Sequence, residues 1–142
     1  MESKLSVSTT IESRVEAVDA AEASVRSFAQ QGGFGDEDLY FLGLAAREIL
    51  INAIVHGNRF DLNKKVTLQL SLVHGRLTIE VLDEGEGFQL DAVPDPRSYE
   101  NRERLSGRGI AMAKAIMDEF SVEQNPPHGT HVRMVKRLKE RE

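Results

Sequence analysis

The stretch Glu48-Ile-Leu-Ile-Asn-Ala-Ile-Val-His-Gly-Asn58 decides the fold prediction for this chain. It continues an apolar run with helical spacing, which predicts a long helix that begins near Asp36 and closes at Gly57. Asp36 is the candidate N-cap. The apolar face of this helix comprises Leu39, Leu42, Ala46, Ile49, Leu50, Ala53 and Ile54. This is the longest helix that the sequence predicts.

Polar residues form a stripe along one face of the same helix. Glu48 and Asn52 are four residues apart and therefore project together, with ~5 to 6 Å between them, and His56 continues the stripe. An amide oxygen such as that of Asn52 suits Mg²⁺, and a neighbouring carboxylate could orient or deprotonate a nucleophile. The alternative is the solvated edge of an amphipathic helix. The apolar neighbours Ile51 and Ala53 argue against it, because a buried amide needs hydrogen-bond partners.

The segments around this helix predict an α+β domain. The other predicted elements are a strand at 5–11, a helix at 16–31, a hairpin with strands at 66–72 and 77–82, a helix at 110–117, and strands at 120–123 and 131–135. Helices segregated from hairpin-connected strands favour a two-layer α/β sandwich with a mostly antiparallel mixed sheet. Residues 88–106 carry prolines and charges with few apolar residues, which indicates a long loop, and such loops are often lids.

Composition excludes several classes of protein. The 142 residues predict a single domain spanning 1–142, and the absence of cysteine excludes disulfides and thiolate metal sites. The net charge of -5, with scattered basic residues, disfavours direct binding to nucleic acid. No apolar leader and no stretch of ~20 apolar residues is apparent, so we expect a cytoplasmic protein that does not interact with membranes.

A second polar piece, Asp83-Glu-Gly85-Glu-Gly87, follows the strand predicted at 77–82. Its glycines would let the backbone pass close to a planar ligand or adopt positive φ angles. The Asp83 carboxylate could accept a hydrogen bond from an exocyclic amine such as that of adenine, and would offer nothing to the carbonyl of guanine. The alternative is a plain acidic turn.

Two further pieces contain glycine. Gly107-Arg108-Gly109 opens the helix predicted at 110–117, with Ser106 as a candidate cap, and the free N–H groups of a helix start can bind phosphates. The sequence contains no P-loop motif. Thr130, after Gly129, could bond a base nitrogen or a water beside it. An ordinary helix start and an ordinary strand start are the alternatives, so the specificity of the signal lies in the ordered set.

The ordered set resembles the N box, the two glycine boxes and the final Gly-Thr of the Bergerat-fold (GHKL) ATPases. That superfamily includes gyrase B subunits, heat-shock chaperones, mismatch-repair proteins and histidine kinases. Within it, the stretch from Glu48 to Asn58 and the short chain are similar to the anti-sigma-factor serine kinases of bacteria. The resemblance covers roughly Ser6 to Arg137.

The resemblance implies a role for each matching residue. Asn52 would hold Mg²⁺, Glu48 would act as general base, and Asp83 would bind the adenine amine of ATP. The remaining implied contacts are Gly85 and Gly87 beside the base, Gly107 and Gly109 at the phosphates, Thr130 at the adenine, and Arg104 or Arg108 at the γ-phosphate. Leu105 occupies a place where some relatives have arginine, which puts the arginine assignment in doubt.

The resemblance also implies the function and the partners. The leading hypothesis is a protein serine/threonine kinase that phosphorylates an anti-sigma-factor antagonist protein and otherwise binds a sigma factor, acting as a homodimer. One alternative is an ATP-binding regulatory module that holds a protein partner without phosphorylating it. A detached histidine-kinase catalytic domain would need a phospho-accepting histidine on a separate helix, whereas all four histidines fall inside the predicted fold. A structural domain without nucleotide is the remaining alternative.

Overall fold

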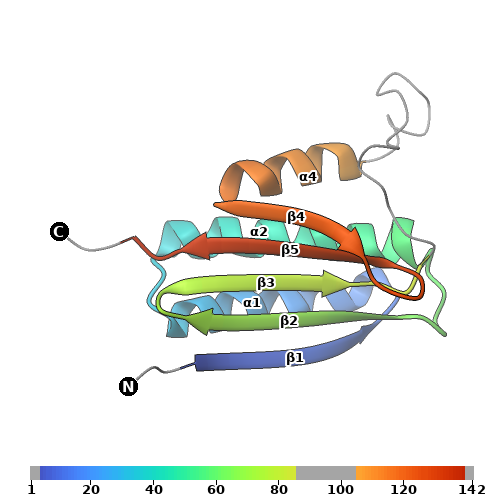
Figure 1. Cartoon of the computed structure of the whole chain (residues 1–142), viewed down its shortest axis with the longest axis horizontal. Coiled ribbons are helices and arrows are strands. Elements are labelled where there is room, and N and C mark those ends of the chain that lie inside the picture. Colours follow the sequence, from blue (N-terminus) through green and yellow to red (C-terminus); the bar gives the residue numbers. More distant parts are fainter. Residues whose placement is uncertain (1–3, 86–104, 140–142) are drawn as a thin grey trace.

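The computed structural model describes residues 4–85 and 105–139 (Figure 1). The described strands form one sheet in the order β1-β2-β3-β5-β4, antiparallel at every pairing. The strands are β1 (Lys4–Glu12), β2 (Lys65–Val73), β3 (Arg76–Leu82), β4 (Glu119–Gln124) and β5 (Thr130–Arg137). The helices are η1 (Val15–Ala17), α1 (Val18–Gln31), α2 (Asp36–Asn52), η2 (Ala53–Gly57) and α4 (Leu105–Ile116).

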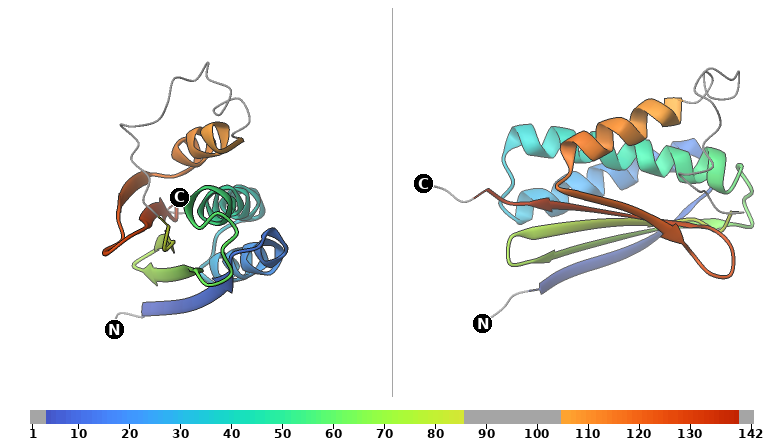
Figure 2. Two further views of the ribbon diagram at one scale, coloured as in Figure 1. Left: turned by 90° about the vertical axis from the view of Figure 1, so that its right-hand side faces the viewer. Right: turned by 45° about the horizontal axis from the view of Figure 1, so that its top comes forward.

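The helices cover one face of the sheet, which gives two layers (Figure 2). This arrangement confirms the predicted α+β sandwich. The predicted hairpin is also confirmed, with a shorter turn than the sequence indicated, because Val73 and Arg76 pair across it. Its two turn residues, His74 and Gly75, have φ angles of 53° and 72°, and such positive angles match the twist of the flanking strands.

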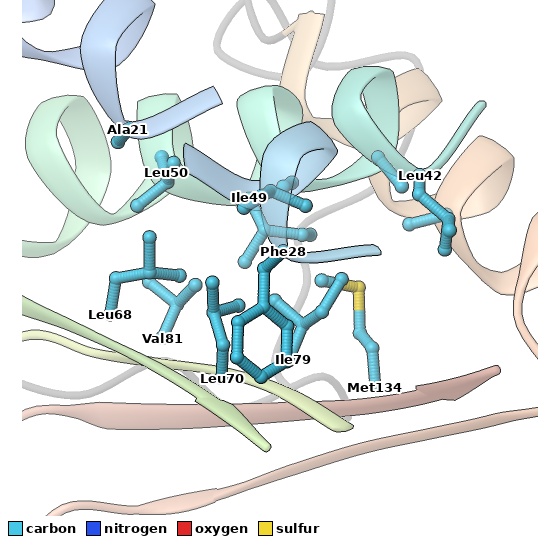
Figure 3. Close-up of a cluster of buried hydrophobic side chains, with 14 of the residues drawn as sticks. Ala21, Phe28, Leu42, Ile49, Leu50, Leu68, Leu70, Ile79, Val81 and Met134 are labelled. Atoms are coloured by element: carbon cyan, nitrogen blue, oxygen red, sulfur yellow. The ribbon is translucent and has the colours of Figure 1, made fainter. Parts of the chain in front are cut away.

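The core lies between the two layers (Figure 3). Phe28 of α1 and Leu42, Ile49 and Leu50 of α2 face the sheet, where Leu68, Leu70, Ile79, Val81 and Met134 meet them. Each of these side chains is at most 7% exposed. Burying one large apolar side chain stabilises a fold by about 1.5 to 3 kcal/mol, so this alternating strand pattern fixes which face the helices cover.

The segment Asp36–Gly57 is 22 residues long with a mean hydropathy of 1.4, enough to span a membrane by length and composition. The sequence analysis did not predict this property. In the structure the helix α2 packs against α1, α4 and the sheet, and a core helix passes the same test. Its composition is explained by these three packing surfaces.

Two predicted helix starts are wrong. The N-cap of α2 is Gly35 rather than Asp36, since Gly35 is extended (φ -80°, ψ 171°) and Asp36 is already helical. Asp36 therefore acts in the first turn, where acidic side chains favour the helix dipole. The helix α4 begins at Leu105 rather than near Ile110, which places Ser106 inside the helix and excludes it as the cap.

The last turn of the α2 segment is a π-helix. The Asn58 amide donates to the Ala53 carbonyl at 2.7 Å, five residues back rather than four. Such a turn holds one more residue than an α-helical turn and is common at functional sites. It brings the end of this segment, at Gly57 and Asn58, beside the residues that follow β3.

Candidate functional site

Three of the predicted site residues meet at the end of the molecule where β3 ends, β5 begins and α2 closes, on the right in Figure 1. Asn52, Asp83 and Thr130 line one cavity of about 50 Å³. The rest of its lining is mostly apolar and comprises Ile49, Ala53, His56, Gly57, Val81, Ile110, Phe120, Val122 and Val132. The sequence analysis predicted that these three residues belong to one site, and the fold brings them together.

Asp83 is the buried carboxylate of this cavity, at 4% exposure. Its Oδ1 accepts hydrogen bonds from the Gly85 amide at 2.9 Å and from the Thr130 amide at 3.1 Å. Burial raises the pKa of Asp83 above its ordinary value, because desolvation disfavours the charged form; the two amide donors and Lys64 oppose this rise. These contacts leave the second oxygen, Oδ2, as the part of the carboxylate available to a ligand.

Glycines enclose Asp83 so closely that side chains would not fit. A Cβ on Gly57 would overlap Asp83 Oδ2, a Cβ on Gly85 would overlap the Gly57 carbonyl, and a Cβ on Gly129 would overlap the Asp83 carbonyl. Gly129 also has a φ of 124°, which other residues rarely adopt. Sequence reasoning assigned Gly57 only to the helix end, since no local signal shows that it contacts Asp83.

Two buried polar atoms at the cavity lack a hydrogen-bond partner within the described part of the chain. They are the hydroxyl of Thr130, a residue that is 4% exposed, and the amide nitrogen of Asn52. Buried polar groups in native structures are nearly always hydrogen-bonded. Together with the free oxygen of Asp83, they make the cavity chemically suited to a ligand with an apolar plane and polar edges.

Glu48 lies beside this cavity and is half-buried. A Cβ on Gly109 would lie 2.6 Å from Glu48 Oε2, so the glycine lets α4 approach α2 closely at this point. Among residues 4–85 and 105–139, Glu48 has neither a hydrogen-bond nor an ion-pair partner. Its carboxylate is therefore available to a substrate group.

The remaining predicted site residues are placed less completely. Gly107 lies in the first turn of α4, where its N–H has no partner within the helix, while Arg108 and Gly109 follow it in the helix. Gly87 and Arg104 lie outside the described residues, as does nearly all of the predicted loop at 88–106. The described residues contain no cluster of three carboxylate or imidazole groups that could hold a metal, so Mg²⁺ would need oxygens from a nucleotide beside Asn52.

The comparisons with known proteins agree with this geometry. The family model described as a histidine kinase-like ATPase domain matches residues 11–136. The chain belongs to this family. Membership of an ATPase family implies ATP as a ligand, and the cavity at Asp83 is where the described residues offer the matching chemistry.

Curated relatives of this ATPase domain are anti-sigma factors. An anti-sigma F factor of Thermoanaerobacter sp. (strain X514) is 32% identical over 120 residues, which cover 82% of each chain. An anti-sigma F factor of Clostridium perfringens (strain ATCC 13124) is 31% identical over 121 residues, covering 83% of this chain and 86% of the relative. These relatives place the ATPase domain in the anti-sigma regulatory branch of its family.

Solved structures show the same fold at lower identity. The RsbU and RsbW domains of Rv1364c from Mycobacterium tuberculosis match with a TM-score of 0.69 and 20% identity, over 94% of this chain and 32% of that one. A histidine kinase domain from Erythrobacter litoralis EL346 matches with a TM-score of 0.56 and 21% identity, over 90% of this chain and 62% of that one. Both matches confirm the predicted fold class.

Proposed function

We propose that this ATPase domain is a protein serine/threonine kinase that phosphorylates an anti-sigma-factor antagonist and, when not engaged with it, binds a sigma factor. The family match and the anti-sigma F factor relatives support this proposal. The observation that carries it is the arrangement at Asp83: a buried carboxylate with one oxygen saturated by amides and the other left at an apolar cavity.

Adenine fits this arrangement. Asp83 Oδ2, when ionised, accepts from an exocyclic amine, and the unpartnered Thr130 hydroxyl lies in the same cavity to bond a base nitrogen or a water. Guanine would place a carbonyl against the carboxylate, which is repulsive in a buried site. The apolar walls from Ile49, Val81 and Val132 suit the faces of the base.

The cavity must widen when a base enters. Its volume of about 50 Å³ holds one or two waters, each of which takes about 30 Å³. One wall comes from α4 and β4, through Ile110, Phe120 and Val122, all of them only partly buried. We expect movement of this wall on binding, because the opposite wall belongs to the buried core helix α2.

The phosphates would extend toward Asn52 and the start of α4. Mg²⁺, when bound, neutralises phosphate charge, and the Asn52 amide oxygen would be its protein ligand. The N–H of Gly107 in the first turn of α4 would face the phosphates. Gly85 and Gly87 would border the base, Gly109 and either Arg104 or Arg108 would serve the phosphates, and Asn52 would hold the metal.

Glu48 would accept the proton of the attacking hydroxyl. In the proposed step, the substrate serine oxygen bonds to the γ-phosphorus, the bond between that phosphorus and the β–γ bridging oxygen breaks, and ADP leaves. The serine proton passes to Glu48, whose carboxylate is partly buried and unpaired among the described residues. Such a reaction depends mainly on positioning and charge neutralisation, which a small domain can supply.

The test is a pair of measurements on the intact chain. Calorimetric titration with Mg-ATP and Mg-GTP should give binding of ATP alone, and γ-³²P-ATP should then label a serine or threonine of the cognate antagonist protein. Failure of ATP to bind a folded sample would reject the nucleotide site. Binding without any labelling of the antagonist would instead favour the second candidate.

That second candidate is an ATP-binding regulator that holds its partner without phosphorylating it. The specific observation in its favour is Leu105, which begins α4 at a place where the resemblance leads one to expect an arginine for the γ-phosphate. A regulator would need the adenine contacts of Asp83 and Thr130, and would be insensitive to loss of the Glu48 carboxylate.

We also propose that the chain forms a homodimer through its first strand. β1 is an edge strand whose outer backbone groups lack a strand partner in the described sheet, and edge strands tend to pair with other chains. Leu5 and Val7 on this strand are 44% and 46% exposed and line a groove with Ala23, Ser27 and Gln31 of α1. A second copy would cover this apolar groove.

A further inference from the structure

Asn58 is a buried amide that the adenine contacts do not use. It follows the π-helical turn directly and is 1% exposed. The sequence analysis included it in the motif that begins at Glu48 but gave it no role. A fully buried asparagine needs its donors and its acceptor satisfied, so its partners show what it holds together.

The Asn58 side chain joins three separate segments. Its Nδ2 donates to Ser13 Oγ at 2.9 Å, just after β1, and to the Lys65 carbonyl at 3.1 Å, at the start of β2. Its Oδ1 accepts from the Glu84 amide at 2.8 Å, just after β3. Ser13 in turn donates to the Lys64 carbonyl. Both donor hydrogens and the acceptor of Asn58 are therefore engaged.

The bond to Glu84 acts on the residues that set the Asp83 carboxylate. Glu84 lies between Asp83 and Gly85 in the chain, so fixing its N–H fixes the turn from which the Gly85 amide donates to Asp83 Oδ1. On the other side, Asn58 follows Gly57, whose Cα lies against Asp83 Oδ2. Asn58 thus controls a neighbour of each carboxylate oxygen.

We propose that Asn58 is a positioning residue for base selection, which orients the Asp83–Gly85 turn so that the free oxygen of Asp83 meets a purine amine. This inference rests on the proposed adenine site. Asn58 itself would touch neither nucleotide nor metal, since its polar atoms are used by Ser13, Lys65 and Glu84. The other side of the same network, at Ser13, would contribute to stability alone.

The test compares Asn58→Ala with Ser13→Ala. Both remove the bond between these two side chains, but only Asn58→Ala releases the Glu84 amide. The probes are Mg-ATP and Mg-ITP, because inosine lacks the exocyclic amine and keeps the same phosphates. Affinities are measured by calorimetry at a temperature where melting curves show every sample to be folded.

We expect Asn58→Ala to weaken ATP binding about tenfold, the effect of losing one well-oriented hydrogen bond to a charged group, and to bring the ATP/ITP affinity ratio toward one. Ser13→Ala should keep the ratio within about twofold of the unaltered protein, whatever its loss of stability. An unchanged ratio in folded Asn58→Ala, or an equal fall in both variants, would overturn the positioning role.

A readout without nucleotide separates this inference from the proposed function. In ¹H–¹⁵N spectra of the free protein, Asn58→Ala should shift the amide signals of Gly85 and Thr130, the two donors to Asp83 Oδ1, whereas Ser13→Ala should leave them in place. If the unaltered chain binds no ATP, the adenine site fails. If both amide signals stay unmoved in Asn58→Ala, the positioning role fails.

A second variant covers the case in which Asn58→Ala does not fold. Asn58→Asp keeps an acceptor for the Glu84 amide and loses the two donated bonds. It should be less stable, because it buries a charge, yet retain the ATP/ITP ratio and the Gly85 amide shift. Loss of the ratio in this variant would show that the bond to Glu84 does not set base selection.

Discussion

Asp83 and Thr130 are joined by a reciprocal pair of hydrogen bonds across the ends of β3 and β5. The Thr130 amide donates to Asp83 Oδ1 at 3.1 Å, and the Asp83 amide donates to the Thr130 carbonyl at 2.9 Å. The Asn125 side chain adds a donor to the Asp83 carbonyl at 2.8 Å. The carboxylate is therefore held by the sheet itself, so its position does not depend on a ligand.

Asp83→Asn should separate stability from binding. The amide oxygen of asparagine can accept the same two backbone N–H groups, while the cost of burying an ionised carboxylate is removed. We expect a melting temperature at pH 8 equal to or above that of the unaltered protein, together with loss of ATP binding. The checks are thermal melts and calorimetry, and retained ATP affinity would remove Asp83 from base recognition.

Stability should depend on pH through Asp83 with a definite sign. Because burial raises the pKa of folded Asp83, the folded state binds more protons than the unfolded state between the two pKa values. The unfolding free energy of the unaltered protein, relative to Asp83→Asn, should therefore rise as pH falls through this window. Parallel urea titrations of the two proteins from pH 8 to pH 4 measure this difference, and a falling difference would contradict the buried, ionised carboxylate.

ATP selectivity should also decline in acid. A protonated Asp83 presents a donor where the adenine amine needs an acceptor, so ATP affinity should fall as pH drops through the raised pKa. Mg-ITP serves as the control, because protonation of its phosphates affects both nucleotides alike. The ATP/ITP affinity ratio should decrease with pH, and a constant ratio would exclude Asp83 as the residue that selects the base.

Gly129→Ala should damage the site more than a matched glycine change. Gly129 and Gly33 have φ angles of 124° and 99°, so alanine at either position costs about 1 to 2 kcal/mol of backbone strain. Only at Gly129 would the added Cβ overlap the Asp83 carbonyl, which costs a further 1 to 3 kcal/mol, roughly. Urea unfolding and ATP titration should show the larger destabilisation and weaker binding for Gly129→Ala alone.

Glu48→Gln should keep nucleotide binding and reduce phosphotransfer by about 100-fold or more, the usual contribution of a general base. The side chain keeps its shape beside Gly109 while its charge is removed. Glu37→Gln, in the exposed first turn of the same helix, is the control. Single-turnover transfer from γ-³²P-ATP to the antagonist measures the effect, and equal rates for both variants would remove Glu48 from the reaction.

Val7→Lys should convert a dimer to a monomer. It places a charge in the groove between β1 and α1, which is apolar at Leu5 and Val7. Leu62→Lys, at a residue that is 57% exposed and does not line that groove, is the control. Light scattering after size exclusion gives the mass of each variant, and a dimer that persists in Val7→Lys would place the interface elsewhere.

The secondary structure was accessible to sequence reasoning wherever one local pattern dominates. The hairpin of β2 and β3 alternates apolar and polar residues and has glycine in its turn, so period and turn chemistry agree. The start of α4 was not accessible, because Gly107 and Gly109 are poor helix formers. Packing against α2 at Glu48 overrides that local preference.

The site was predictable in its membership but not in its internal contacts. Asn52, Asp83 and Thr130 are marked by residue type and order, and the structure brings them to one cavity. The approach of Gly57 to Asp83 joins residues far apart in the chain and leaves no local trace. The bond from the Glu84 amide to Asn58 is equally non-local, and only the burial of an asparagine after an apolar helix hinted at it.

The π-helical turn at Ala53–Gly57 makes the length of this segment a determinant of the site. Removing one residue from it would restore regular α-helical bonding and rotate everything that follows by about 100° around the helix axis. The backbone bonds would all be recovered, yet Asn58 would point away from Glu84 and Gly57 from Asp83. An alignment that closes a one-residue gap here would therefore match letters and misplace the residues that frame the base.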